Sequence, residues 1–249
     1  MTSRVAASVT AVIAAAGSGE RLGAGGPKAF VPLAGRPLVE WSIAAMRASA
    51  GVRSIVVACP PGHVHDLGGH DLGVVDGGAT RSQSVANALE AVGTELVAIH
   101  DAARPLVTPA LVEGVVATLV EDPEADGAIV ATPVTDTIKQ VRGEGRLAET
   151  TRPPLCIPEM QKGGRVIEAT VDRARLWAAQ TPQVFRVAAL RRALEADPHQ
   201  VEAATDEAML IEAAGGRVLI HPAPPENLKV TTPLDLRLAE LLLAERSAQ

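Results

Sequence analysis

Short apolar runs rich in β-branched residues alternate along this chain with stretches of helical periodicity. The runs predict strands at residues 9–14, 54–58, 73–75, 96–100, 127–131 and 217–221. The periodic stretches predict helices at residues 37–48, 82–91, 109–121, 187–195, 206–214 and 233–246. Strands that alternate with helices indicate an α/β fold with a mainly parallel sheet and helices on both faces.

The alternation breaks down between Asp136 and Arg173, where glycines and prolines punctuate short polar and β-type segments. This stretch is typical of an arm that leaves the sheet, and we expect the insertion at about residues 137–172. The length of 249 residues suits one large α/β domain. We therefore expect a single domain over residues 1–249, with no second catalytic domain after the last helix.

Charge and aromatic content argue against a nucleic-acid-binding protein. The chain has a formal net charge of -6, only 2% aromatic residues and no tyrosine. Polyanions attract basic surfaces, and many nucleic-acid binders stack bases on aromatic side chains. We expect no membrane partner either, because no apolar run approaches the roughly 20 residues that span a bilayer.

The two cysteines, Cys59 and Cys156, are too few and too far apart for a disulfide framework or for zinc-ligand spacing. We interpret both as packing residues. Their scarcity indicates a reducing compartment, so we expect a cytoplasmic protein.

A glycine-rich loop, residues 15–28, follows the first predicted strand. Glycines in this position let backbone N–H groups approach an anion closely, which predicts a phosphate site. The loop is not a Walker A motif, because Lys28 stands between Pro27 and Ala29 instead of in Gly-Lys-Ser/Thr. It also departs from the dinucleotide fingerprint, because Leu22 occupies the place of the third glycine or alanine.

Two cations in this loop, Arg21 and Lys28, stand seven residues apart. That spacing suits a triphosphate, whose charge must be neutralised along its length. A plain glycine-rich connection with solvated charges is the alternative, because lone glycine patterns often mislead.

Asp101 follows the predicted strand 96–100, in the run His-Asp-Ala-Ala-Arg-Pro. Ligands of open parallel sheets gather at the carboxyl ends of strands, so Asp101 is expected near the glycine-rich loop. A carboxylate there suits Mg²⁺ that bridges to phosphate oxygens. Taken alone, Asp101 would more often be a cap or turn residue.

A second glycine segment, residues 76–85, follows the short predicted strand 73–75 and precedes a helix. Thr80 or Ser82 is a candidate N-cap for that helix, as Thr205 is for the predicted helix 206–214. Capping and contact with a nucleoside are compatible.

In this order, the three segments resemble the 2-C-methyl-D-erythritol 4-phosphate cytidylyltransferase family of the non-mevalonate isoprenoid pathway. The resemblance covers almost the whole chain and continues through residues 133–139, 170–173, 180–183, 205–208 and 226–231. It implies a Rossmann-like three-layer sandwich of the nucleotidyltransferase and glycosyltransferase-A type, with a protruding arm, and a homodimer. Residues 141–170 are longer than the arm of the relatives.

The resemblance assigns the CTP site residue by residue. The phosphates would contact the first loop at Ala15, Ala16, Gly17, Gly19, Arg21 and Lys28. Cytosine and ribose would contact Gly78, Ala79, Ser84, Asp101 and Ala102. Asp101 would also lie near Mg²⁺ or another divalent cation.

Catalysis and acceptor binding are implied in the same way. Arg21, Lys28 and Lys229 match the catalytic cations, and Lys229 would reach both substrates. Arg173, Thr205 and Thr137 match residues that position the methylerythritol phosphate. Of these, Arg173 and Thr137 would come from the arm of the partner subunit.

The implied reaction is attack of the acceptor's 4-phosphate on the α-phosphorus of CTP, in line, with release of pyrophosphate. The product is 4-diphosphocytidyl-2-C-methyl-D-erythritol. The phosphate nucleophile is already ionised at neutral pH, so no histidine base is expected, and catalysis depends on positioning and charge neutralisation.

Three alternatives stay open at this point. A ribitol 5-phosphate cytidylyltransferase shares the fold and the CTP site. Another sugar-phosphate nucleotidyltransferase would accept UTP or GTP. A non-catalytic nucleotide-binding protein is the alternative from a different class.

Overall fold

The computed structural model describes residues 7–17, 19, 22, 26–63, 67, 72–142, 166–196 and 198–247. The chain divides into two compact units. The first unit comprises Met1–Ala131 and Ala179–Gln249, and the second comprises Thr132–Ala178. None of the helices in the described ranges is long and apolar enough to cross a membrane.

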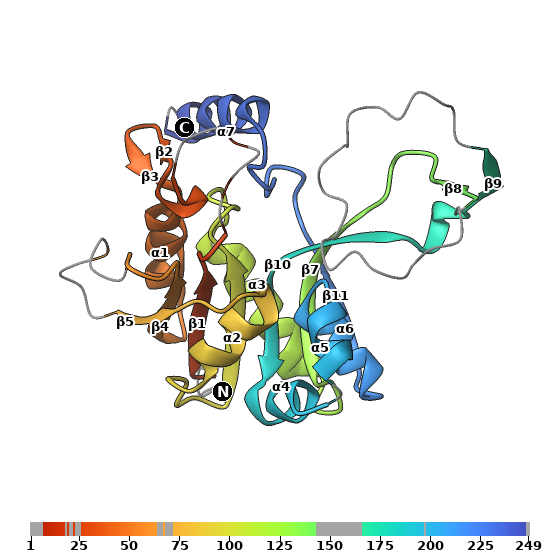
Figure 1. The fold of residues 1–249 in the computed structure, drawn as a ribbon, viewed down its shortest axis with the longest axis horizontal. Helices are drawn as coiled ribbons and strands as arrows, with labels where there is room; N and C mark the ends of the chain where they lie inside the picture. The colour runs from red at the N-terminus through yellow and green to blue at the C-terminus, as the bar shows by residue number, and fades with distance from the viewer. Residues whose placement is uncertain are drawn as a thin grey trace, which may run out of the picture. The chain divides into compact units, whose positions relative to one another are not determined.

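The first unit is built on a seven-stranded sheet (Figure 1). Its strand order is β11 (Val218–Pro222), β7 (Gly127–Pro133), β10 (Trp177–Arg186), β6 (Leu96–Asp101), β1 (Val9–Ala14), β4 (Val52–Cys59) and β5 (Gly73–Asp76). β1 is parallel to β4 and β6, β4 to β5, and β11 to β7, whereas β10 is antiparallel to β6. The prediction of a mainly parallel sheet is confirmed, and each predicted strand of this sheet differs from the observed one by at most two residues at either end.

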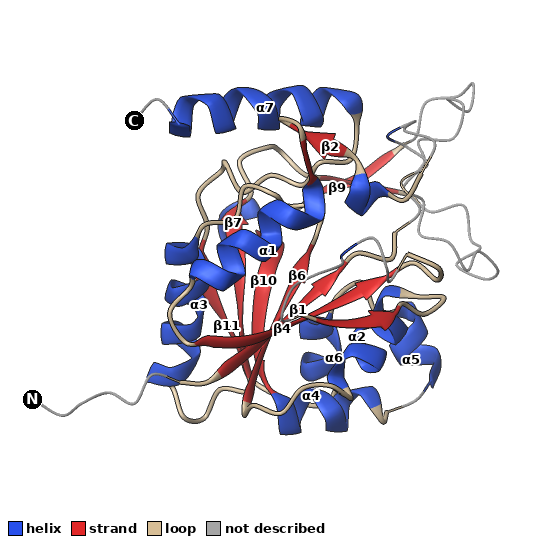
Figure 2. Cartoon of the chain, turned by 90° about the vertical axis from the view of Figure 1, so that its left-hand side faces the viewer, coloured by secondary structure: helices blue, strands red, loops and turns tan. Residues whose placement is uncertain are grey.

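Helices cover both faces of this sheet, as the alternation of strands and helices predicted (Figure 2). They are α1 (Leu38–Ala48), α2 (Arg81–Leu89), α3 (Pro109–Glu121), α4 (Val187–Leu194), α5 (Pro198–Ala203), α6 (Glu207–Ala213) and α7 (Pro233–Ser247). α1 and α3 pack on one face, and α2, α4 and α6 pack on the other. The short helix α5, which has no fully buried residue, was not predicted.

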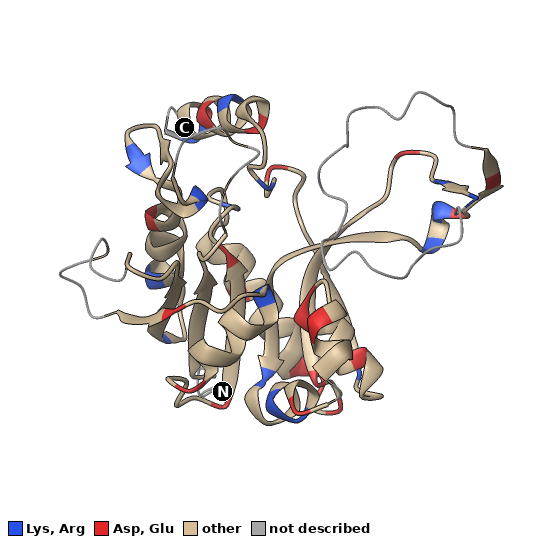
Figure 3. Cartoon of the chain, viewed as in Figure 1, with Lys and Arg blue, Asp and Glu red and all other residues tan. Residues whose placement is uncertain are grey.

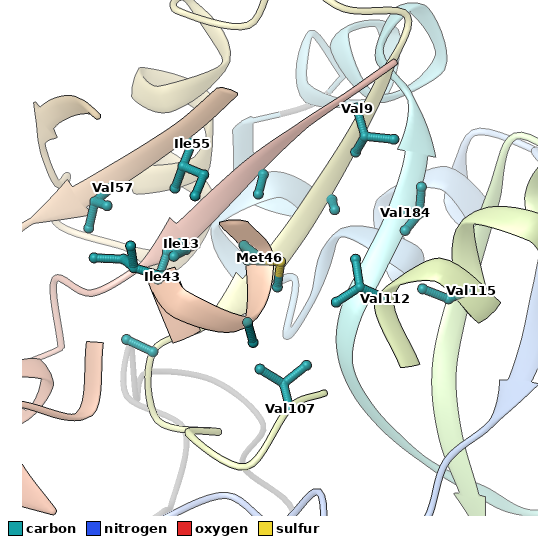
Figure 4. Close-up of a cluster of buried hydrophobic side chains, with 14 of the residues drawn as sticks. Val9, Ile13, Ile43, Met46, Ile55, Val57, Val107, Val112, Val115 and Val184 are labelled. Carbon is teal, nitrogen blue, oxygen red and sulfur yellow. The ribbon is translucent and has the colours of Figure 1, made fainter. Parts of the chain in front are cut away.

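The core of the first unit is aliphatic, because aromatic residues are scarce. Val9 and Ile13 of β1 are fully buried in the cluster that Ile43 and Met46 of α1 also line (Figure 4). Successive side chains of a strand point to opposite faces, so Val12 joins the cluster under α2 and α4 instead. Burial on both faces explains why β1 reads as a continuous apolar run.

A third cluster lies under α7. It joins Leu33 of the short strand β2 (Pro32–Leu33), Leu106, Val230 and Ala239 of α7. β2 pairs with β3 (Arg36–Pro37), and both lie between the glycine-rich loop and α1 in the chain. The segment that carries Lys229 is therefore fixed through its neighbour Val230, which is fully buried.

β10 is the one strand of the main sheet that the sequence did not predict. Its middle holds Gln180, Thr181 and Pro182, and a proline argues against a central strand because it cannot donate to the ladder. Val184 and Phe185 are nevertheless fully buried, and they pair with β6. Tertiary burial therefore overrides local propensity here.

Two helix starts show where the capping predictions succeeded and failed. The Thr80 hydroxyl accepts a hydrogen bond from the Gln83 N–H at 3.1 Å, so Thr80 caps α2. Thr205 was expected to cap α6, and that prediction is wrong. Asp206 is the cap, because its carboxylate accepts from the Met209 N–H at 3.0 Å.

The second unit contains a two-stranded antiparallel sheet of β8 (Lys139–Val141) and β9 (Ile167–Thr170). A short helical turn, Arg173–Arg175, follows β9. The arm insertion expected at residues 137–172 falls within this unit, and its residues 143–165 lie outside the described residues.

Acidic and basic residues are interspersed over the described helices and loops (Figure 3). The formal net charge of the full sequence is -6.

Candidate active site

The carboxyl ends of β1 and β6 lie side by side. Ala14 and Asp101 are register partners, and the Ala102 N–H donates to the Ala14 carbonyl at 3.1 Å. The glycine-rich loop begins at the next residue, Ala15, whose N–H donates to the Ala58 carbonyl at 2.9 Å. Asp101 and the start of the loop therefore share one edge of the sheet, as the sequence predicted.

Part of the glycine-rich loop is described, and it folds back on itself. The Lys28 N–H donates to the Gly17 carbonyl at 3.3 Å. Gly19 has a φ of +74°, and a Cβ added there would lie 2.7 Å from the Cβ of Lys28. Only glycine therefore fits this position, and its absence of a side chain brings Lys28 against the loop. The other cation of the loop, Arg21, lies outside the described residues.

The second glycine segment lies against the first loop. The Gly77 N–H donates to the Cys59 carbonyl at 2.7 Å, and a Cβ at Gly77 would lie 2.3 Å from the Cβ of Ala16. The Ser84 hydroxyl accepts from the Gly78 N–H at 3.0 Å. The neighbouring Ala79 is exposed. The structure thus brings together the two glycine segments that the sequence assigned to one ligand.

Asp101 is paired with two cations. Its Oδ1 accepts from Arg81 Nε at 3.1 Å, and its Oδ2 accepts from Lys229 Nζ at 2.7 Å. Lys229 follows Asn227, which is tied to the end of β6 by the Arg104 guanidinium, a donor to the Asn227 carbonyl at 2.8 Å. Two sequence-predicted residues 128 positions apart are therefore in direct contact.

Arg81 bridges Asp101 to a second carboxylate. Its Nη1 donates to Glu207 Oε2 at 2.5 Å, and the Glu207 side chain is fully buried. Arg81 is the first residue of α2 and Glu207 the first residue of α6, so the pair joins the N-termini of these two helices. One guanidinium thus contacts two carboxylates, which suits its planar array of donors.

The charges of this cluster depend on one another. Burial opposes ionisation of Asp101, but Arg81 and Lys229 outweigh it and hold the pKa of Asp101 well below its usual range. Burial would lower the pKa of Arg81, but Glu207 and Asp101 reverse this effect and raise it. Burial raises the pKa of Glu207 despite Arg81. Asp101 is therefore an anion at neutral pH, and it remains one because its cations are in place.

A chain of buried hydrogen bonds holds the backbone of Asp101 in place. The Asp101 N–H donates to the Thr181 hydroxyl at 3.0 Å, and this hydroxyl is 3.1 Å from His100 Nδ1. His100 Nε2 donates to the Arg104 carbonyl, which only accepts, at 3.2 Å. His100 is therefore the Nε2–H tautomer and takes the hydroxyl proton at Nδ1. Burial lowers the pKa of His100 to about 4, so the ring is neutral at pH 7.

The acceptor-binding predictions fall in two places. Thr205 lies in the first unit, exposed and two residues before Glu207. Thr137 and Arg173 lie in the second unit, where Arg173 donates to the Thr135 carbonyl. The roles of Thr205, Thr137 and Arg173 in acceptor binding stay predictions.

Comparisons with known proteins identify the family. The sequence model of IspD, 2-C-methyl-D-erythritol 4-phosphate cytidylyltransferase, matches residues 9–154 and 156–245. The protein of that name from Symbiobacterium thermophilum is 41% identical, over 97% of this chain and 95% of its own length. The one from Frankia casuarinae is 42% identical, over 95% of this chain and 81% of its own length. The chain belongs to the 2-C-methyl-D-erythritol 4-phosphate cytidylyltransferase family.

A solved structure agrees with this identification. The crystal structure of the 2-C-methyl-D-erythritol 4-phosphate cytidylyltransferase from Thermus thermophilus matches with a TM-score of 0.72 and 32% identity. It covers 94% of this chain and 98% of the other. The sequence resemblance and the α/β nucleotidyltransferase fold are both confirmed. As a member of the family, the chain is a nucleotidyltransferase with cytidylyltransferase activity on 2-C-methyl-D-erythritol 4-phosphate, in the non-mevalonate isoprenoid pathway.

The metal prediction can be tested against the donors of this cytidylyltransferase. The described residues contain no group of three His, Cys, Asp or Glu side chains that could hold a metal ion. Mg²⁺ in nucleotide enzymes is commonly held by one or two carboxylates together with substrate phosphates. The Asp101 carboxylate, ionised and 11% exposed, fits a metal ion that arrives with the triphosphate.

Arg81 and Glu207 lie in the segments 76–85 and 205–208 that the sequence analysis singled out. Neither residue was assigned a role there. A usable signal existed for Arg81. It is the first residue of α2, where the helix dipole disfavours a cation unless a carboxylate compensates it. Glu207 offered no such signal, because an acidic residue in the first turn of a helix is ordinary.

The His100 pKa generates a prediction for the stability of this protein. Between pH 6.5 and about 4, the unfolded chain binds a proton at His100 and the folded chain does not. The stabilisation from neutral His100 is therefore complete above pH 6.5 and is lost as the pH falls to about 4. We expect it to amount to about 3 kcal/mol.

Denaturant unfolding between pH 7.5 and 4 measures this effect. His100→Asn keeps a donor and an acceptor but does not titrate, so the difference between the two proteins isolates His100 from the other groups. Parallel stability curves for wild type and His100→Asn would contradict the prediction.

Proposed function

We propose that CTP binds at the carboxyl ends of β1, β5 and β6, with the triphosphate along the glycine-rich loop. The contact between Asp101, Arg81 and Lys229, next to the start of this loop, is the observation that carries the proposal. In it a carboxylate and two cations meet where an open parallel sheet presents its ligands.

The phosphates are assigned to Ala15, Ala16, Gly17, Gly19, Arg21 and Lys28. Backbone N–H groups of glycine-rich loops form concave anion sites, and Lys28 adds a full charge. The fold-back of the loop at Gly19, which holds Lys28 close, supports this assignment.

The nucleoside is assigned to Gly78, Ala79, Ser84, Asp101 and Ala102. Ser84 is buried, and its hydroxyl donates to the Thr80 carbonyl while it accepts from Gly78. The segment that we propose to contact cytosine is therefore held in place by α2 in the absence of a ligand. A preorganised site loses less conformational entropy on binding.

The reaction we infer is transfer of CMP from CTP to the 4-phosphate of 2-C-methyl-D-erythritol 4-phosphate. The phosphate oxygen forms a bond to the α-phosphorus of CTP, and the bond to the β-phosphate oxygen breaks, which releases pyrophosphate. The nucleophile is ionised at neutral pH, so no proton has to be removed. This accords with His100, which is buried, neutral and fully hydrogen-bonded.

Charge neutralisation is then the main task of the protein. Arg21, Lys28 and Lys229 would stabilise the charge that develops on the phosphates. Lys229 suits this role because its side chain is 44% exposed and Asp101 holds it at the end of β6. When bound at Asp101, Mg²⁺ or another divalent cation would add Lewis-acid stabilisation of the same phosphates.

We also propose a homodimer formed through the second unit, in which Thr137 and Arg173 of one subunit position the acceptor in the site of the other. Thr205 would complete that phosphate contact from the first unit. Val166 and Ile167 beside and within β9 are 62% and 56% exposed, and Trp177 is 39% exposed. An interface through the second unit would cover these apolar side chains.

One assay tests the reaction. CTP, UTP, GTP and ATP are each offered with 2-C-methyl-D-erythritol 4-phosphate or ribitol 5-phosphate and Mg²⁺, and pyrophosphate is measured. We expect release with CTP and the methylerythritol phosphate. Release with ribitol 5-phosphate alone would overturn the acceptor, and release with UTP or GTP in preference to CTP would overturn the nucleotide.

The two loop cations generate the next prediction. Lys28→Ala and Arg21→Ala should each lower kcat by on the order of 10² or more, because each removes a preorganised cation that faces developing charge. Steady-state kinetics with CTP measures the loss. Near-normal kcat in a folded variant would contradict the assigned roles.

The proposed dimer generates a further testable prediction. Ile167→Glu places a charge in the proposed interface, and because Ile167 is exposed it should leave the subunit folded. We expect monomers by sedimentation velocity and a loss of activity, since Arg173 would no longer reach a partner. Leu234→Glu on α7, at a position 71% exposed in the first unit, is the matched control. Equal dimer content in both variants would count against the interface.

A further inference from the structure

Glu207 is a fully buried carboxylate that the proposed chemistry does not use. Its Oε2 accepts from Arg81 Nη1, whereas its Oε1 has no hydrogen-bond partner among the described residues. A buried carboxylate is costly unless it is paired and hydrogen-bonded. The Arg81 guanidinium is the described cation that offsets this cost, so Glu207 and Arg81 are each held by the other.

The geometry gives Arg81 a fixed orientation. Nε faces Asp101 at 3.1 Å and Nη1 faces Glu207 at 2.5 Å, and both atoms belong to one rigid plane. Two contacts on different edges of that plane leave it little freedom to rotate. Arg81 stands at the N-terminus of α2, where the helix dipole would otherwise repel the guanidinium. Glu207 therefore both compensates the charge of Arg81 and sets its orientation.

The two cations of Asp101 differ in how firmly they are held. Arg81 has a second carboxylate partner, Glu207, and a side chain that is 26% exposed. Lys229 is 44% exposed, and Asp101 is its ion-pair partner among the described carboxylates. An incoming triphosphate would therefore draw Lys229 away from Asp101 more readily than Arg81, which a second carboxylate also holds.

We propose that Glu207 is a positioning residue of the CTP site, which fixes Arg81 on Asp101 so that Asp101 stays in place when Lys229 turns to the phosphates. Glu207 acts through Arg81 and does not itself touch a substrate. The inference rests on the proposed function of Asp101 and Lys229.

The test measures CTP binding by isothermal titration calorimetry in the presence of Mg²⁺. Glu207→Gln keeps the size of the side chain and removes its charge. We expect CTP to bind about tenfold more weakly, as is typical when a residue behind a ligand-binding group is removed. The matched control is Asp122→Asn, which alters the Asp122–Arg217 ion pair, 2.7 Å long, away from the carboxyl ends of β1 and β6. We expect that control to bind CTP as wild type does.

A double-mutant cycle separates this role from a general loss of stability. If Glu207 acts through Arg81, Glu207→Gln should have no further effect on CTP binding in the Arg81→Met background. The double variant should also be more stable than Arg81→Met alone, because it no longer carries an unpaired buried charge. An equal loss of CTP affinity in both backgrounds would overturn the proposal.

Two more variants keep the test decisive. If Glu207→Gln does not fold, Glu207→Asp in both backgrounds replaces it, with the same expected pattern and a smaller loss of affinity. Asp101→Asn separates the inference from the proposed site. Loss of CTP binding in Asp101→Asn with wild-type binding in Glu207→Gln would overturn the role of Glu207 alone. Wild-type binding in Asp101→Asn would overturn the site and the inference together.

Discussion

The candidate active site depends on an Asp101 carboxylate that stays ionised although it is buried. Asp101 lies at the end of a strand that is buried along its whole length. Burial alone would favour the neutral acid, and only the two cations beside it make the anion the stable form. Removing either cation would leave a poorly solvated charge, and that cost ties α2, β6 and the segment around Lys229 to one another.

A network of buried hydrogen bonds next to Asp101 holds the carboxylate in position. Thr181 and His100 hold the backbone of Asp101, and Arg104 holds the loop that carries Lys229. Each of these groups is buried, where an unmade hydrogen bond costs free energy, so the hydrogen bonds that form restrict how Asp101 can lie. The position of the carboxylate is thereby set by these hydrogen bonds, and its charge by the ion pairs with Arg81 and Lys229.

The glycine segments show a different physical device. Gly19 and Gly77 allow the chain to approach itself more closely than any side chain would permit. This closeness places Lys28 against the first loop and the second glycine segment against Ala16. The phosphates that we propose to bind along these segments would meet backbone groups and small residues, and could approach N–H donors directly.

The sequence by itself determined the order of strands and helices, the mainly parallel sheet, and the edge where Asp101 and the glycine loop meet. Those features follow from periodicity and from the rule that ligands gather at the carboxyl ends of parallel strands, both of which are local or topological. The sequence did not predict β10, because Pro182 argues against a strand. It also did not predict that Asp206 caps α6. Only the tertiary structure decided that Arg81 and Glu207 pair, since residues 126 positions apart carry no local sign of contact. The partners of Asp101 could likewise be named only once burial showed which charges had to be neutralised.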